Sequence, residues 1–202
     1  MVSKLTFTKY DLPPLDRKEV LRYMGAPTAD DTTAQLIKEC EKESADCFTY
    51  LVCFDVFGIK VKDKTVDFGA FSVTSGDLAK NLQGCKSAVI FAATVGVEID
   101  RLIKKYSALS PAKSLCFQAV GNERIEALCD LFNKQIKECQ DSVGKLTRPR
   151  LSAGYGDFAL KHQKDIFSVL DCERQIGVTL SQSLLMTPQK SVTAVIGIKE
   201  GV

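Results

Sequence analysis

The nine residues from Ser87 to Val95 place the strongest constraint on how this chain folds. They read Ser-Ala-Val-Ile-Phe-Ala-Ala-Thr-Val and lie between Gly84 and Gly96. A short, almost entirely apolar run bounded by glycines is typical of a strand that is buried on both faces. We therefore expect this segment to be a central strand of a sheet, with other elements packed on each side of it.

The longest helical pattern starts at Ser110-Pro111, where proline is tolerated in the first turn, and ends at Gly144. Its apolar residues recur at close to helical spacing and predict a buried face: Leu115, Ile125, Leu128, Phe132, Ile136 and Cys139. The charged residues expected on its other faces are Glu123, Lys134, Lys137 and Glu138.

The rest of the chain mixes helices and strands in irregular order. Helices are expected near residues 16–24, 30–44, 75–84, 98–106 and 160–170, and strands near 47–61, 65–69, 176–180 and 191–198, the first two forming a hairpin. Because a regular strand–helix–strand alternation is missing, we predict an α+β fold with a largely antiparallel, twisted sheet and helices packed around it. Residues 1–202 are expected to form a single domain.

The bulk composition narrows the possible function classes. A chain of 202 residues is long enough for one sizeable core. Its 27 basic and 25 acidic residues leave a formal net charge of +2, which gives no electrostatic case for binding nucleic acid. No apolar run approaches the ~20 residues needed to cross a bilayer, and the first residues lack the apolar region of a secretory signal. We therefore expect a cytoplasmic protein with no membrane partner.

The chain has eight cysteines, but no two are spaced as a C-x₂-C pair, and His162 is the only histidine. Structural zinc sites normally use such pairs, so reduced and mostly buried thiols are favoured over a metal site. One functional hypothesis is an enzyme that uses a reactive cysteine, and it rests on the cysteine count alone.

The segment from Arg148 to Asp157 combines features of a ligand-binding loop. Its two arginines offer planar donor forks that match a carboxylate or phosphate. Gly154 and Gly156 allow positive φ and a close approach of a ligand to the backbone, and Tyr155 between them offers a ring and a hydroxyl. These residues suit a small zwitterionic or nucleoside-like ligand. The alternative is an exposed basic loop with ordinary turn glycines.

Two acidic residues of the long helix, Glu126 and Asp130, are four positions apart and lie on one face. An acid beside the arginine loop would complement a ligand that carries both an ammonium and a carboxylate group. The alternative interpretation is a solvated acidic stripe.

Four segments together resemble the activation domain of cobalamin-dependent methionine synthase. The family's loop reads Arg-Pro-Ala-Pro-Gly-Tyr, and residues 150–155 stand at the matching positions. Residues 176–188 resemble its Gly-x-x-Leu-Thr-Glu-Ser-x-x-Met-x-Pro segment, and residues 191–193 match its Ser-Val-Ser. Glu126-Ala127 is similar to the family's Ala-Glu-Ala helix. The resemblance is strongest over residues 119–198.

The resemblance implies a domain that binds S-adenosylmethionine and docks over a cobalamin domain. It would supply the methyl group when oxidised cob(II)alamin is reductively remethylated, with the electron coming from flavodoxin or another reductant. Arg150 would anchor the methionyl carboxylate, and Glu126 would make a polar contact to the ligand. The residues implied to line the ligand are Ser152, Ala153, Gly154 and Tyr155. No general acid or base is required of the chain, so no catalytic residue is implied.

The chain has no cobalamin-binding Asp-x-His-x-x-Gly segment, so cobalamin would come only through a partner. We expect a stand-alone reactivation protein that acts in trans on a cobalamin-binding methionine synthase lacking its own activation domain. It would be one component of a methyltransferase system. The alternative is a docking module that has lost ligand binding. It is motivated by Leu151 and Ala153, which replace two prolines of the family's loop, and by the lack of a match to the family's N-terminal acid and C-terminal tyrosine.

Overall fold

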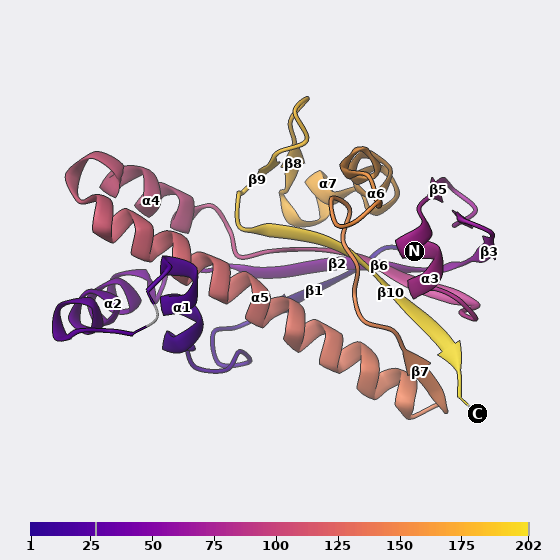
Figure 1. The fold of residues 1–202 in the computed structure, drawn as a ribbon, viewed down its shortest axis with the longest axis horizontal. Helices are drawn as coiled ribbons and strands as arrows, with labels where there is room; N and C mark the ends of the chain where they lie inside the picture. The colour runs from indigo at the N-terminus through magenta and orange to yellow at the C-terminus, as the bar shows by residue number, and fades with distance from the viewer. Residues whose placement is uncertain (27, 202) are drawn as a thin grey trace.

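The strand predicted at Ser87–Val95 lies at the centre of the main sheet. In a computed structural model, which describes residues 1–26 and 28–201, β6 (Ser87–Thr94) pairs on one side with β2 (Tyr50–Gly58) and on the other with β10 (Ser191–Glu200). Adding β1 (Ser3–Phe7) and β7 (Lys145–Thr147) gives the order β1-β2-β6-β10-β7, in which all neighbours are antiparallel. The predicted α+β fold with an antiparallel sheet is confirmed (Figure 1).

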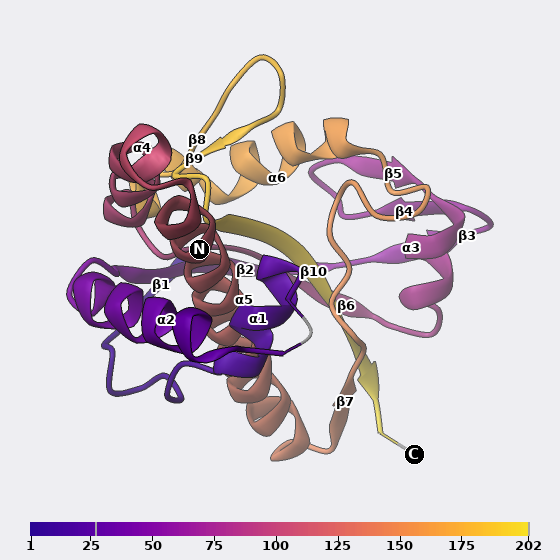
Figure 2. The same cartoon turned by 60° about the vertical axis from the view of Figure 1, so that its left-hand side comes forward.

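Helices cover both faces of this sheet because β6 presents apolar side chains alternately to each face. Val89 and Phe91 belong to one core cluster, and Ala88 and Ile90 to another. The first cluster is closed by α1 (Arg17–Met24), α2 (Asp31–Ser44), α4 (Glu98–Leu109) and α5 (Pro111–Asp141). The second is closed by α3 (Gly76–Asn81), α6 (Gln163–Leu170) and α7 (Cys172–Ile176), as Figure 1 and Figure 2 show.

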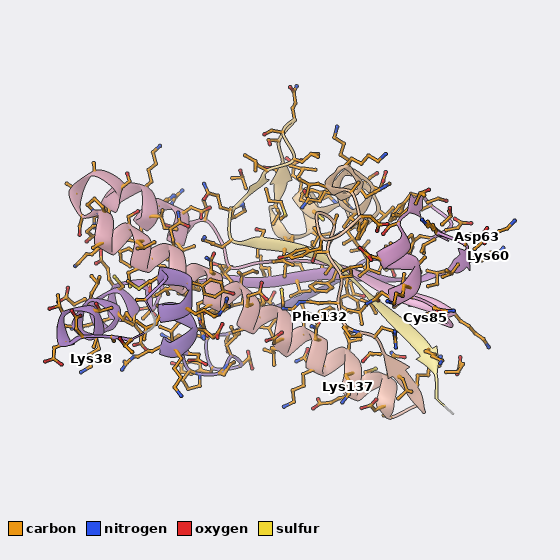
Figure 3. All side chains as sticks on the ribbon, viewed as in Figure 1. Lys38, Lys60, Asp63, Cys85, Phe132 and Lys137 are labelled. Atoms are coloured by element: carbon orange, nitrogen blue, oxygen red, sulfur yellow. The ribbon has the colours of Figure 1, made fainter. Side chains whose placement is uncertain are left out.

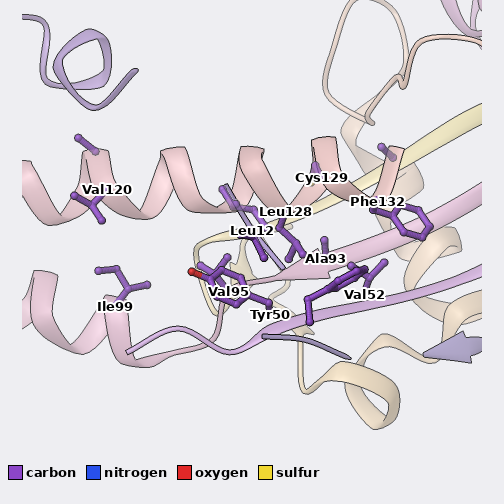
Figure 4. Close-up of a cluster of buried hydrophobic side chains, with 14 of the residues drawn as sticks. Leu12, Tyr50, Val52, Ala93, Val95, Ile99, Val120, Leu128, Cys129 and Phe132 are labelled. Atoms are coloured by element: carbon purple, nitrogen blue, oxygen red, sulfur yellow. The ribbon is translucent and has the colours of Figure 1, made fainter. Parts of the chain in front are cut away.

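The helix α5 runs along the sheet and supplies much of the first cluster. Leu128 and Phe132 are fully buried (Figure 4). Measured between centroids, the Phe132 ring lies 4.8 Å from that of Phe91 and 5.2 Å from that of Phe54. Lys137, one turn further along, is exposed (Figure 3). Within the described part of the chain, no helix is both long enough and apolar enough to span a membrane.

A small sheet, a two-stranded ribbon and a 3₁₀ turn complete the fold. A small antiparallel sheet contains β3 (Lys60–Lys62), β4 (Thr65–Asp67) and β5 (Ser72–Thr74), and its first two strands are the predicted hairpin. A second ribbon pairs β8 (Thr179–Leu180) with β9 (Met186–Thr187). A 3₁₀ turn, η1 (Leu160–His162), leads into α6.

The predicted helix starts rest on side-chain caps. Asp16 accepts hydrogen bonds from the backbone N–H groups of Lys18 (2.9 Å) and Glu19 (3.3 Å) at the start of α1. Ser110 caps α5, and Pro111 occupies its first turn. The side chains of Asp16 and Ser110 satisfy N–H groups that have no partner inside the helix, and this is why the sequence pattern located both helix starts correctly.

Three expectations were wrong. Leu115 and Cys139 were expected on the buried face of α5, but both are exposed. Residues 176–180 are mostly not a strand, because α7 continues to Ile176, Gly177 ends it in the left-handed conformation, and only Thr179–Leu180 pair as β8. Cys172 and Ile176, four residues apart, both face the core, which favours the helix. Glu123 was expected on an outer face of α5, but it is 5% exposed and paired with Arg124.

The Glu123–Arg124 pair fastens the segment before α1 to α5. Arg124 donates to the carbonyl oxygens of Pro13 (2.9 Å) and Pro14 (3.3 Å), and Glu123 accepts from the N–H of Asp16 (3.2 Å). Burial opposes the charge of Arg124, but the hydrogen bond and the charge of Glu123 outweigh it and raise the pKa of Arg124. Both charged groups are therefore compensated within the core.

Replacing Arg124 with leucine should leave Glu123 buried without its partner and lower the free energy of unfolding by about 3–5 kcal/mol. The Glu123→Leu/Arg124→Leu double variant should lose less stability than Arg124→Leu, because no isolated charge remains. Urea denaturation measures both. The matched control is Arg17→Leu, whose partner Glu41 is on the surface, and it should change stability by about 0–1 kcal/mol. An Arg124→Leu loss no larger than the Arg17→Leu loss would contradict this account.

Candidate ligand-binding site

The loop at residues 150–155 is held against the edge of the main sheet. The Leu151 N–H donates to the carbonyl oxygen of Val195 on β10 (3.0 Å), and the Val195 N–H donates back to Leu151 (2.9 Å). The chain reaches this point from β7 and passes beside β10 towards α6 (Figure 1 and Figure 2). Leu151 stands where the family's loop has a proline, which has no N–H to donate. This chain therefore positions the loop with a backbone bridge.

The end of the loop is anchored at the start of α3. The carboxylate of Asp157 accepts hydrogen bonds from the hydroxyl of Ser75 and the N–H groups of Gly76 (2.7 Å) and Asp77 (3.1 Å). In return, the Asp157 N–H donates to the carboxylate of Asp77 (3.1 Å). The Ser75 hydroxyl, followed by the two N–H groups, holds the pKa of Asp157 below its usual value. We did not single out Asp157 from the sequence, because its role depends on a contact 80 residues away.

Both loop glycines have positive φ, +100° at Gly154 and +55° at Gly156. Space for a side chain is smallest at Gly156, where an added Cβ would lie 2.0 Å from a carboxylate oxygen of Asp77. The expectation that these glycines permit positive φ is confirmed at both positions. At Gly156 an added side chain would also lack space.

A cleft of about 360 Å³ opens between this loop, α5 and the start of β10. Its volume is within the range of small-molecule sites. Five of the six residues predicted for the site line it: Glu126, Arg150, Ser152, Ala153 and Tyr155. The sixth, Gly154, lies in the loop between them and is not part of the lining. Tyr155 is 68% exposed, so its ring is available at the mouth of the cleft.

Arg150 reaches from the loop to α5 and pairs with both predicted acids. Its Nη1 lies 2.6 Å from Asp130 Oδ1, and its Nη2 donates to Glu126 Oε2. Burial opposes the charge of Arg150, but the hydrogen bond with Asp130 and the neighbouring charges outweigh it and raise its pKa. Two of the five guanidinium N–H donors are engaged, so others remain for a ligand. The trio carries one positive and two negative charges, a surplus of one negative charge.

Other cleft residues were missed as site residues. They are Leu151, Gln163 and Met186, together with Ser191, Val192 and Thr193 at the start of β10. Gln163 carried a weak signal in the sequence, since it shares the buried face of α6 with Ile166 and Leu170 although it is polar. The contribution of β10 depends on its unpaired edge, which no local pattern reveals.

A larger cavity of about 680 Å³ is also lined by Glu126 and by Asp130. It includes none of the residues 150–155, and acidic side chains dominate its polar lining. The smaller cleft combines a cation, one acid (Glu126), hydroxyls and an aromatic ring, and it is therefore the better candidate for a zwitterionic ligand.

The cysteines give no comparable site. All eight are free thiols; six are buried, Cys47 is half-buried and Cys139 is exposed. Burial raises the pKa of the Cys129 thiol to about 12, so this thiol stays protonated at neutral pH. Among residues 1–26 and 28–201, no cluster of histidine, cysteine, aspartate and glutamate is arranged to hold a metal ion.

Comparison with known proteins identifies the family of the chain. A family model described as "Vitamin B12 dependent methionine synthase, activation domain" matches residues 76–201, more than half of the chain and the part that contains the loop. The chain belongs to this family. As a member of the methionine synthase activation domain family, it has its loop, the α5 acids and β10 all within the matched range.

A solved structure described as "Crystal Structure of the MetH Reactivation Domain bound to AdoHcy" has the same fold. The two superpose with a TM-score of 0.70 and 13% sequence identity, over 98% of this chain and 78% of that chain. At this identity the likeness establishes the fold. A comparison with curated proteins found no match.

The Gly156→Ala variant tests how the loop is confined. Alanine should be strained at positive φ by about 1–2 kcal/mol, and displacing Asp77 should add ~1–3 kcal/mol. The matched control is Gly144→Ala, because Gly144 also has positive φ but has no atom within 4 Å of an added Cβ. Urea denaturation should show the larger loss at Gly156. Equal losses for the two variants would mean that the contact with Asp77 does not confine the loop.

Proposed function

We propose that this chain binds S-adenosylmethionine in the cleft and serves as a reactivation module for a separate cobalamin-binding methionine synthase. The observation that carries the proposal is the Arg150 guanidinium held between Glu126 and Asp130 at the wall of a ligand-sized cleft. Membership in the activation domain family supports it. A further support is that the similar solved structure is described as bound to AdoHcy, which is S-adenosylmethionine without its transferable methyl group.

The charges of the trio suit this ligand better than a simple anion. S-adenosylmethionine has a carboxylate, an ammonium and a sulfonium group, and thus carries a net charge of +1. The remaining N–H donors of Arg150 match the carboxylate, while Glu126 and Asp130 together attract the two cationic groups. A phosphate would meet both carboxylates without such compensation. The local surplus of one negative charge therefore selects for a cationic zwitterion.

The role of the chain would be to bind and orient the methyl donor. The methyl acceptor would be the reduced corrinoid, a strong nucleophile, carried by the partner protein. Holding the methyl donor against a docked partner makes the transfer effectively unimolecular, and this contribution requires no acid or base from the chain.

The alternative of a docking module without a ligand was motivated by the two lost loop prolines. The bridge between Leu151 and Val195 and the anchoring of Asp157 provide another way to hold the loop in place. Preorganisation is therefore not lost with the prolines, and this favours a ligand-binding site over the docking module.

Isothermal titration calorimetry with S-adenosylmethionine tests the site directly. Arg150→Ala should weaken binding roughly 10- to 150-fold, the value of a charge-assisted contact of ~1.5–3 kcal/mol. The affinity of Arg150→Lys should lie between those of the wild type and Arg150→Ala, because lysine keeps the positive charge but lacks the planar pair of donors.

The matched control is Arg148→Ala, which removes an exposed arginine two residues away that donates to the Asn81 carbonyl oxygen and does not line the cleft. Its affinity should equal that of the wild type. Thermal unfolding of each variant separates lost binding from lost structure. No heat of binding at millimolar ligand, or an unchanged affinity in Arg150→Ala, would refute the site.

Action in trans is tested by mixing the chain with a cobalamin-binding methionine synthase that lacks its own activation domain. With S-adenosylmethionine and a reductant such as reduced flavodoxin, the cob(II)alamin absorbance should decay, and omission of the chain should abolish the decay. Arg150→Ala should slow it at subsaturating ligand. Association with the partner without ligand binding or decay would instead establish the docking module.

A further inference from the structure

A buried lysine joins the strand and the helix that form two walls of the cleft. Lys190 is 8% exposed, and its Nζ lies 2.6 Å from Oε1 of Gln118 and 2.7 Å from Oδ1 of Asn122. A lysine side chain is almost never buried without partners, and here both partners are uncharged amides of α5. Burial lowers the pKa of Lys190, and the nearby charge of Asp100 opposes this effect. Lys190 itself is not part of the cleft lining.

The partners of Lys190 determine which turns of α5 lie beside the start of β10. Gln118, Asn122 and Glu126 recur every four residues and therefore lie along one face of the helix. Glu126 lines the cleft one turn after Asn122. On the strand, Ser191 directly follows Lys190 and is the first cleft residue of β10. The lysine therefore connects α5 to β10 one residue from the cleft on the strand and one turn from it on the helix.

The aliphatic stem of Lys190 lies against α5 at a glycine. A Cβ added to Gly121 would lie 3.1 Å from both Cγ and Cε of Lys190 and 3.2 Å from Ile99 of α4, closer than ordinary van der Waals contact. Glycine inside a helix is destabilising relative to alanine, so its presence there usually has a packing reason. Gly121 makes room for the lysine stem and for Ile99, and the ammonium group of the lysine then reaches the two amides.

The backbone around Lys190 is anchored independently of its side chain. The Lys190 carbonyl oxygen accepts a hydrogen bond from the N–H of Val95, just after β6 (3.1 Å). The Gln189 N–H donates to the carboxylate of Asp100 on α4 (2.7 Å). These bonds attach the start of β10 to β6 and α4, and neither of them reaches α5. The side chain of Lys190 supplies the polar link to α5.

We propose that Lys190 is a positioning residue for the cleft. Through Gln118 and Asn122 it holds the start of β10 at a set distance and register from α5, so that residues 191–193 and Glu126 face the same ligand. This inference rests on the proposed function and adds to it a residue outside the cleft lining. Hydrophobic packing between a strand and a helix is non-directional, whereas hydrogen bonds require a defined geometry. The two hydrogen bonds of the lysine therefore select one alignment of the two walls.

The test combines calorimetric titration of the full chain with S-adenosylmethionine and ¹H–¹⁵N NMR spectra of the ligand-free protein. Lys190→Met keeps an unbranched stem and removes the donors. It should weaken binding roughly 3- to 30-fold, the effect typical of residues that act on a site without contacting its ligand. It should also shift the amide signals of residues 191–193 and of Glu126 before any ligand is added. Lys137→Met, at an exposed position of the same helix, is the control and should do neither (Figure 3).

A double-mutant cycle shows whether the lysine acts through its amides. The Gln118→Met/Asn122→Leu variant should weaken S-adenosylmethionine binding, and adding Lys190→Met to it should weaken binding little further, because the interaction is already lost. Additive losses of affinity would overturn the inference. If Lys190→Met alone does not fold, the triple variant decides, because it leaves no amide oxygen without its lysine partner; wild-type affinity in the triple variant would also overturn the inference.

The two measurements separate this inference from the proposed function. If S-adenosylmethionine binds the wild type and Lys190→Met equally well, the lysine is only structural, the inference is wrong and the function stands, whatever the unfolding temperature of the variant. If S-adenosylmethionine does not bind the wild type, the function is wrong, and the spectra of the ligand-free proteins decide the inference. Amide shifts at residues 191–193 and at Glu126 then support the alignment of the walls by Lys190, and shifts confined to the neighbours of Lys190 overturn it.

Discussion

The burial of β6 on both faces is the constraint on which the rest of the structure depends. Its alternating side chains need apolar cover on each side, so α5 and its neighbours close one face and α3, α6 and α7 close the other. The strand next to it, β10, is covered on both faces for the same reason, but over its first residues it has no strand beyond it. The cleft lies at this free edge, where residues from both layers meet.

The loop at residues 150–155 turns this edge into a site with defined geometry. The Leu151–Val195 bridge fixes its beginning, and the Asp157 carboxylate at the start of α3 fixes its end. Between these anchors, Arg150 is held by Glu126 and Asp130. A rigid arginine in a cleft loses little side-chain freedom when a ligand binds, which favours affinity without a large apolar contact.

Local patterns predicted the elements well where the residues themselves cap or bury them. The Asp16 and Ser110 caps and the apolar run of β6 are of this kind. The same reasoning failed at residues 176–180, because a five-residue helix and a short strand contain too few residues to show a period. It also failed at Glu123, because a charged residue in a helical pattern is normally exposed, and only the pairing with Arg124 makes its burial possible.

By itself, the sequence predicted the fold class, the family and the loop, and it placed Glu126 and Asp130 on one face of a helix; that these acids pair with Arg150 was decided by the tertiary structure. These depend on residue types at fixed spacings: arginine and glycine in one short segment, and two acids four apart on a helix. Tertiary structure alone decided that Gln163 and Thr193 belong to the same cleft, that Asp157 anchors the loop, and that a backbone bridge stands where the family has proline. The physical reason is that each of these depends on contacts between residues about 30 to 80 positions apart, which are set by the packing of both layers on the sheet.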